Sequence, residues 1–133
     1  MKKNYEKILP SYICDIQEIN NLSKVMFMNN FPHHQFILCT SGTGKICTES
    51  NIEQTVSKSN IVFINSSILF SIRQQENFSL KRIAFNGNFV TNYLQYFDFN
   101  QAVVFVPKSD EVFNAFNIAY DGYMHNKDDI QNS

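Results

Sequence analysis

The stretch Phe36-Ile-Leu-Cys-Thr-Ser-Gly-Thr-Gly-Lys-Ile-Cys-Thr48 decides the fold class. Its two outer blocks, Phe36–Cys39 and Lys45–Thr48, contain the β-branched and aromatic residues that favour strands. Between them lies Ser41-Gly-Thr-Gly44, whose two glycines can adopt positive φ angles without steric cost. The pattern predicts a tight hairpin over Ser41–Gly44 that pairs the two blocks as antiparallel neighbours.

Further blocks of the same kind follow along the chain. Each is bounded by Ser, Gly, Asn or Pro, as is typical of short strands separated by turns. The blocks are Ile61–Ile64, Ile68–Ile72, Leu80–Phe85 and Ala102–Val106. Repeated short strands of this spacing predict a β-sandwich or a β-barrel.

Two segments have helical spacing instead. The apolar residues of Asn86–Phe97 recur so that they form one stripe on a helix. A second helix is predicted over Asp110–Tyr123, because Ser109 can cap it and two acidic residues occupy its first turn, where the helix dipole favours negative charge. The chain then becomes polar. We therefore expect one domain over residues 1–125, with residues 126–133 as the start of a linker.

The composition narrows the classes of function. A chain of 133 residues with 44% hydrophobic residues forms one folded core. Its formal net charge of -1 argues against direct binding to nucleic acid. The longest apolar run, Ala102–Val106, is too short to span a membrane. Cys14, Cys39 and Cys47 lack the spacing of a disulfide framework or a zinc site, so we expect reduced core residues in a soluble, cytoplasmic protein.

Candidate residues for chemistry are few. His33 and His34 suggest a metal site, but adjacent residues of a strand point to opposite faces, and no further ligand is placed near them. The Cys, His and Ser residues show no spacing typical of a nucleophile with its base. The sequence therefore predicts no catalytic residues, no bound metal and no cofactor.

Three stretches carry a resemblance to a known family. They are Gln35–Lys45, Ser57–Asn65 and Lys81-Arg-Ile-Ala-Phe-Asn-Gly87, and the last is the most specific. In content and order they resemble the N-terminal domain of AraC-type transcriptional regulators, over residues 30–125. The resemblance implies a mainly β fold, a cupin-like β-barrel of the jelly-roll kind, followed by two α-helices.

The resemblance also implies a function. The family's domain dimerises and, in some members, binds a small effector inside the barrel, while paired helix-turn-helix units bind DNA. We therefore expect a non-enzymatic regulatory domain that forms a homodimer and whose DNA-binding domain is absent from this chain. The alternative is a small metal-dependent cupin enzyme acting on a sugar-like metabolite, with its metal near His33 or His34. It is weakened because Phe70 stands where a metal-binding cupin often has His.

Alternation along the strands suggests which residues line the barrel. One face is apolar and consists of Phe36, Leu38, Ile46, Phe63, Phe70, Ile72, Ile83 and Phe85. Such a lining makes a filled core or a pocket for an apolar ligand such as a fatty acid. In the opposite register Cys39, Cys47, Lys81 and Arg82 point inward, and Arg82 could bind a carboxylate, although the cost of burying a cation favours solvent-exposed positions for Lys81 and Arg82. The predicted ligand-binding residues are Phe36, Leu38, Ile46, Phe63, Phe70, Arg82 and Phe85.

We expect the dimer interface to lie on the second predicted helix. Its apolar face is wider than the stripe of about 100° that one packed surface needs. The predicted interface residues are Val112, Phe113, Phe116, Ala119, Tyr120 and Tyr123. The alternative, in which this helix docks entirely on its own barrel and on Asn86–Phe97, remains open.

Overall fold

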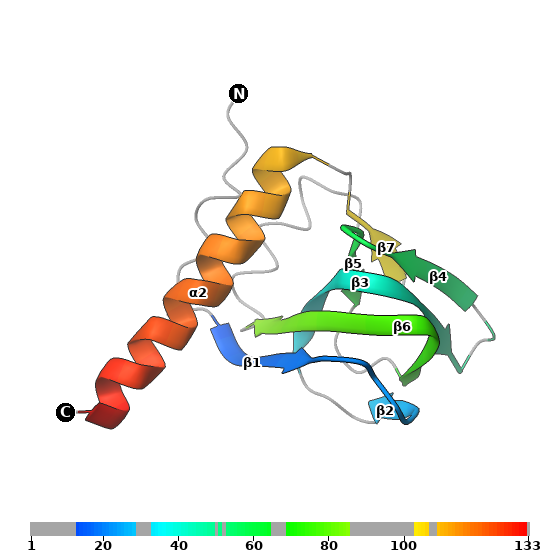
Figure 1. Cartoon of the computed structure of the whole chain (residues 1–133), viewed down its shortest axis with the longest axis horizontal. Coiled ribbons are helices and arrows are strands. Elements are labelled where there is room, and N and C mark those ends of the chain that lie inside the picture. Colours follow the sequence, from blue (N-terminus) through cyan, green and yellow to red (C-terminus); the bar gives the residue numbers. More distant parts are fainter. Residues whose placement is uncertain are drawn as a thin grey trace.

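The fold is described from a computed structural model. It describes residues 13–28, 33–49, 51, 53–64, 69–85, 103–106 and 109–132. These residues form a seven-stranded antiparallel sheet and the C-terminal helix α2 (Asp110–Asn132) (Figure 1). The helix predicted over Asn86–Phe97 lies outside the described residues.

The strands are connected through two long members of the sheet. The bounds are β1 (Ile13–Ile19), β2 (Met26–Met28), β3 (His34–Thr48), β4 (Glu53–Ser57), β5 (Ile61–Ile64), β6 (Phe70–Phe85) and β7 (Val103–Phe105). Their order is β1-β6-β3-β5-β7, with β2 paired to β6 and β4 paired to β3. Over the described ranges this pairing leaves an open, curved sheet and not the closed barrel that the sequence predicted.

The predicted hairpin at Ser41–Gly44 is wrong. β3 runs through this segment without reversing, and its register with β6 shifts on either side of Ser41 and Thr43. Gly42 has a φ of 69°, and the Cys39 thiol donates to the carbonyl oxygens of Ser41 and Gly42. The segment is therefore a bulged bend within one strand, because β3 keeps its pairing with β6 on both sides of it.

The bend has a counterpart in β6. Phe70–Ile72 of one predicted strand and all of another, Leu80–Phe85, belong to this one strand. Asn77, which lies between them, has a φ of 45°. One half of β3 pairs with β5 and with the end of β6, while the other half pairs with β4 and with the beginning of β6. The sheet therefore folds over itself at this point, as the curvature of β3 and β6 shows (Figure 1).

The two faces of the sheet carry separate cores. The inner core, to which both halves of the folded sheet contribute, consists of Leu22, Ile37, Cys39, Ile46, Val56, Val62, Ile64, Phe70, Ile72, Phe78 and Leu80. The outer core lies between the sheet and α2 and contains Ile13, Phe36, Leu38, Ile61, Phe63, Ile83, Val106, Val112, Ala115, Phe116, Ala119 and Tyr120. Burial of these apolar side chains is the main favourable contribution to folding.

The helix α2 begins as predicted and ends later. The backbone N–H of Val112 donates to Ser109 Oγ at 3.1 Å, which caps the first turn. Asp110 and Glu111 occupy that turn. The helix was expected to end at Tyr123, but it continues to Asn132, so residues expected to begin a linker are helical.

Candidate functional site

A cation is buried on the inner face of the sheet. Ile83, the next residue of β6, belongs to the outer core, so Arg82 points to the opposite face. Leu80, two positions before Arg82, belongs to the inner core on that same face. Arg82 is 4% exposed, so of the two positions that the sequence left open for it, inward or solvent-exposed, the solvent-exposed one is wrong. Lys81 points the other way, and its Nζ lies 4.9 Å from the centroid of the Tyr120 ring.

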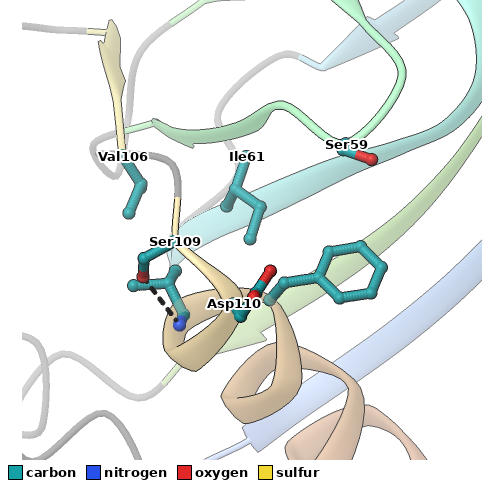
Figure 2. Close-up of a pocket in the computed structure, with 7 residues that line it drawn as sticks. Ser59, Ile61, Val106, Ser109 and Asp110 are labelled. Carbon is teal, nitrogen blue, oxygen red and sulfur yellow. Dashed lines mark hydrogen bonds between the residues drawn. The ribbon is translucent and has the colours of Figure 1, made fainter.

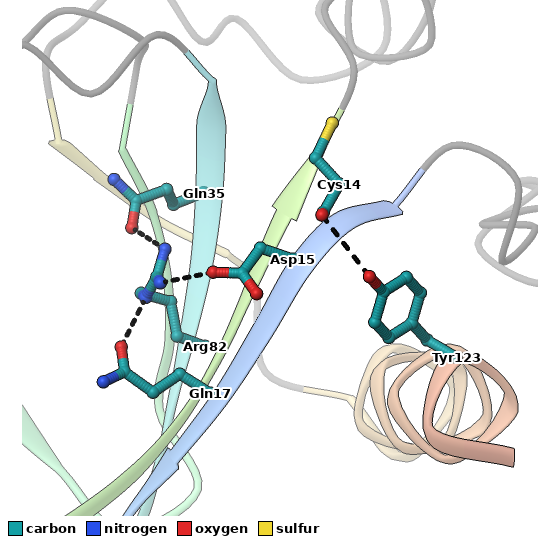
Figure 3. A network of polar contacts seen from close by, with 6 residues as sticks. All are labelled: Cys14, Asp15, Gln17, Gln35, Arg82 and Tyr123. Atoms are coloured by element: carbon teal, nitrogen blue, oxygen red, sulfur yellow. Dashed lines mark hydrogen bonds and ion pairs between the residues drawn. The ribbon is translucent and has the colours of Figure 1, made fainter. Parts of the chain in front are cut away.

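Arg82 is held by side chains from two neighbouring strands (Figure 3). Its Nη1 donates to Gln35 Oε1 at 2.9 Å, and its Nε donates to Gln17 Oε1 at 3.1 Å. Its Nη2 forms an ion pair with Asp15 Oδ2 at 3.2 Å. Gln35 lies on β3, while Asp15 and Gln17 lie on β1, on the other side of β6. The partners thus converge on the guanidinium because β6 lies between β1 and β3.

The electrostatics of this cluster are uneven. Burial is the main influence on Arg82 and lowers the pKa of its guanidinium, while the nearby Asp15 carboxylate acts in the opposite direction. Gln35 is 1% exposed, but the Asp15 side chain is 53% exposed. The cluster therefore pairs a buried cation with a carboxylate that water reaches. A planar guanidinium in such a setting is suited to binding a carboxylate.

A bulge in β1 places Asp15 beside Arg82. Ile13 pairs with Phe85 and Asp15 pairs with Ala84, so Cys14 is an extra residue between two consecutive pairs. As a result Ile13 and Ile16 both pack on the outer core although three positions separate them. Asp15 then falls on the inner face. Its position could not be read from simple alternation along β1.

Cys14 contacts the helix from the same bulge. Tyr123 Oη of α2 donates to the Cys14 carbonyl oxygen at 3.4 Å (Figure 3). The Cys14 thiol lies 3.8 Å from His33 Nδ1. Burial, and then the charge of Asp15, raise the pKa of this thiol, so it is protonated at neutral pH.

The predicted ligand-binding residues do not share one face. Ile46 and Phe70 belong to the inner core, which is the side on which Arg82 lies. Phe36, Leu38 and Phe63 belong to the outer core and face α2. The expected common face is therefore wrong, because the bulge at Ser41–Gly44 changes the alternation along β3. The side chain of Phe85 lies outside the described residues.

The predicted dimer stripe packs mainly within its own subunit. Val112, Phe116, Ala119 and Tyr120 are buried in the outer core, and Tyr123 packs partly against it. These residues pack on the chain's own sheet, as the alternative to the dimer interface expected, while its other expected partner, Asn86–Phe97, lies outside the described residues. Phe113 is 37% exposed, and two further apolar side chains of α2 reach solvent. They are Ile118, which is 65% exposed, and Met124.

A cavity lies beside the first turn of α2, apart from the Arg82 cluster (Figure 2). It has a volume of about 420 Å³. Its lining residues are Ser59, Ile61, Val106, Ser109, Asp110, Val112 and Phe113. They come from the segment that leads into β5, the end of β7 and the helix, and the sequence contained no signal that would unite them. Asp110 of the first turn of α2 is the acidic residue among them.

The described part of the chain contains neither a cluster of metal-ligating side chains nor a helix that could cross a membrane. Within the described ranges, no three or more His, Cys, Asp or Glu side chains lie together in a way that could hold a metal ion. His34 stacks on Phe63 with ring centroids 5.6 Å apart. No helix in the described part of the chain combines the length and the hydrophobicity needed to cross a bilayer.

Solved structures with a similar fold include several of ToxT from Vibrio cholerae. ToxT of strain O395 has a TM-score of 0.61 at 14% identity, over 82% of this chain and 44% of ToxT. ToxT bound to (E)-4-(8-methylnaphthalen-1-yl)but-3-enoic acid has a TM-score of 0.62 at 13% identity, over 82% of this chain and 47% of ToxT. A ToxT structure with a bound unsaturated fatty acid has a TM-score of 0.51 at 12% identity, over 80% of this chain and 51% of ToxT.

Sequence comparisons gave partial matches. No family model matches the chain. The UvrABC system protein B of Halalkalibacterium halodurans is 32% identical over 83 residues, which are 62% of this chain and 12% of that protein. The Listeria monocytogenes protein of the same name is 34% identical over 77 residues, or 58% of this chain and 11% of that protein. The chain thus matches about an eighth of these relatives and spans about half of ToxT, with which it shares a fold.

Proposed function

We propose that this chain is the regulatory domain of an AraC-type transcriptional regulator, which binds an effector and dimerises. DNA binding would belong to a helix-turn-helix domain outside this sequence. The proposal is supported by the fold shared with about half of ToxT. The observation that carries the effector-binding part is the buried Arg82, held on the apolar inner face by Gln35, Gln17 and Asp15.

The chemistry of this site favours an apolar carboxylic acid, such as a fatty acid. Arg82 would offer its guanidinium to the carboxylate, and the inner core on the same face, to which Ile46 and Phe70 belong, is the apolar environment that the rest of the ligand would enter. A sugar would require many polar partners, because a buried polar group that stays unpaired costs about 1–3 kcal/mol. The two ToxT ligands, an unsaturated fatty acid and a naphthalenyl butenoic acid, both combine a carboxylic acid with an apolar body.

Thermal unfolding with and without ligand tests this proposal. The naphthalenyl butenoic acid and oleate are added to the purified chain, with oleyl alcohol as the ligand that lacks a carboxylate. A ligand at about 100 times its Kd stabilises the folded state by about 2.7 kcal/mol, which raises Tm by several degrees. We expect both acids to raise Tm and the alcohol to have little effect.

Substitutions at two arginines, Arg82 and Arg73, identify the binding residue. Arg82→Met should abolish the shift, and Arg82→Lys, which keeps the charge but loses the planar fork, should weaken it. Arg73→Met is the control, because Arg73 lies on the same strand but is half exposed and forms its ion pair with Glu53. Circular dichroism confirms that each variant is folded. Equal ligand shifts in Arg82→Lys, Arg73→Met and wild type would contradict the assignment of Arg82.

Dimerisation is proposed through the solvent-facing side of α2. Because most of the predicted stripe packs on its own sheet, the proposal uses the exposed apolar residues Phe113, Ile118 and Met124 from the described side chains of α2. Sedimentation velocity should show a dimer that Ile118→Asp converts to a monomer, while Asn114→Asp, which adds the same charge to an exposed polar position, leaves the dimer intact. A wild-type chain that stays monomeric at every concentration would refute this part of the proposal.

A further inference from the structure

We propose that the bulge at Cys14 couples ligand binding at Arg82 to the helix α2. A ligand carboxylate would displace Asp15 from Arg82, and the resulting movement of β1 would weaken the contact between Cys14 and Tyr123. This inference rests on the proposed function, because it concerns the regulation of the same site. The coupling itself can be tested without a ligand.

The bulge connects the two faces of the sheet over adjacent residues. Asp15 contacts Arg82 on the inner face, and the carbonyl of Cys14 accepts the Tyr123 hydroxyl on the outer side (Figure 3). Cys14 itself is the extra residue of the bulge, so it has no opposite partner in the register with β6. A bulged residue interrupts the ladder that holds a regular strand residue in place. This part of β1 can therefore move with less disruption than the rest of the strand.

Asp15 is the partner that a ligand can replace. Its side chain is largely accessible to water, whereas Gln35 is buried, so release of Asp15 restores its solvation while release of Gln35 would leave a buried amide unpaired. A second carboxylate at Arg82 would also repel Asp15, because like charges at short range disfavour each other. The apolar body of the ligand supplies the driving force that Asp15 lacks.

Tyr123 is placed to report this change to the helix. It lies on α2 after the residues that anchor the helix in the outer core, which end at Tyr120. Beyond it the helix continues to Asn132. Tyr123 connects this part of the helix to β1 through the hydrogen bond of its hydroxyl group. Its ring also packs partly against the outer core. Loss of the bond should therefore loosen α2 around Tyr123 more than around Val112.

Hydrogen–deuterium exchange of α2 in the full chain tests the coupling. The variant Asp15→Asn removes the ion pair and mimics a ligand that has displaced Asp15. Tyr123→Phe removes the other end of the link. The control is Glu18→Gln, which removes the same charge from an exposed position of β1 that is next to the helix but not bonded to Arg82. Exchange around Tyr123 should rise about five-fold in Asp15→Asn and in Tyr123→Phe and stay unchanged in Glu18→Gln.

Ligand affinity provides a reciprocal measurement. The coupling free energy between two sites is the same in both directions. If ligand binding weakens the contact between Cys14 and Tyr123 by a given factor, loss of that contact must increase the affinity for the ligand by the same factor. Titration with the naphthalenyl butenoic acid should therefore give a lower Kd for Tyr123→Phe than for wild type, by about five-fold. In Tyr123→Phe the ligand should no longer change exchange in α2.

The outcomes separate this inference from the proposed function. If the acid binds through Arg82 but neither the acid nor Asp15→Asn alters exchange around Tyr123, the coupling is overturned and the effector site stands. If no acid binds but Asp15→Asn still loosens α2, the coupling stands and the effector proposal fails. Equal effects of Asp15→Asn and Glu18→Gln would show a general effect of charge on β1, which also overturns the coupling.

Discussion

Replacing Gly44 with alanine tests the physical origin of the bend in β3. Gly44 pairs with Gln74 of β6, and its Cα faces the ring of Phe78. A methyl group at this position would overlap the Cγ, Cδ2 and Cε2 atoms of that ring. Phe78 is fully buried in the inner core, so its ring cannot move aside without displacing its neighbours.

The magnitude follows from two opposing effects. Overpacking of a dense core costs about 1–3 kcal/mol, and contact with a buried ring places this case near the upper end. A Gly→Ala change in a permitted backbone conformation returns about 0.4–1 kcal/mol by restricting the unfolded chain. Gly44 is not among the residues with positive φ, so backbone strain adds nothing. The net expectation is a loss of about 2 kcal/mol in the free energy of unfolding.

Urea unfolding followed by far-ultraviolet circular dichroism measures this loss. The urea midpoint should fall while the m value stays constant, since the surface exposed on unfolding hardly changes. The corresponding fall in Tm is about 8 °C for a domain of this size. In the background Phe78→Leu, which removes the ring, the same substitution should cost close to nothing, so the double-mutant cycle should give a coupling of about 2 kcal/mol.

Gly42 provides the contrast that makes the test specific. Its φ of 69° disfavours a side chain, and an added methyl group would overlap the backbone carbonyls of Glu76 and Asn77. Gly42→Ala should therefore cost more than Gly44→Ala and should not be relieved by Phe78→Leu. A loss for Gly44→Ala that is equal with and without the Phe78 ring would refute the reasoning.

Three further predictions concern stability. Ser109→Ala removes the hydroxyl that caps α2 at Val112 and should cost about 1 kcal/mol in urea unfolding, whereas a loss below about 0.3 kcal/mol would contradict the cap. Burial raises the pKa of Cys39 above 9.0, so its unfolded form loses the thiol proton first, and the stability present below pH 9.0 should fall as pH rises through the folded pKa. Urea midpoints of wild type and of Cys39→Ala at about pH 8 and pH 10 measure this effect. An equal change of the midpoint with pH in both proteins would disprove it. Glu53→Gln breaks exposed ion pairs with Lys45 and Arg73 and should change stability by less than about 0.5 kcal/mol; a loss above about 1 kcal/mol would show a stronger network.

Local signals in the sequence predicted several elements correctly. Strand-forming residues marked the regions of β3, β5, β6 and β7, and the cap at Ser109 marked the beginning of α2. These features depend on residues near one another in the chain. β1, β2 and β4 were not predicted. The bulge at Cys14 breaks the alternation of β1, β2 has only three residues, and Glu53–Ser57 is mostly polar. The end of α2 was placed too early for a similar reason, since a polar segment can extend a helix that is already formed.

The bend in β3 required information from distant residues. A glycine pair between two strand-forming blocks fits a hairpin turn and a bulge equally well, because both use a residue of positive φ. The choice depends on β6, where Asn77 has a positive φ opposite the bend and Phe78 occupies the space left by Gly44. Those residues are more than 30 positions away, in line with the contact between Ser41 and Asn77 at a separation of 36 residues. The hairpin prediction failed because it considered only one of the two strands.

The same bend determines which side chains reach Arg82. Ile37 and Cys39 share the inner core with Ile46, although an odd number of positions separates them from it. Strict alternation would have placed Ile46 with Phe36 and Leu38 on the side of α2. The bulge in β1 has the corresponding effect on Asp15, which it turns toward Arg82. There are thus two irregularities, one in each strand beside β6. Together they place an apolar lining and a paired guanidinium on one face of the sheet. Regular strands with the same sequence would place these groups on opposite faces.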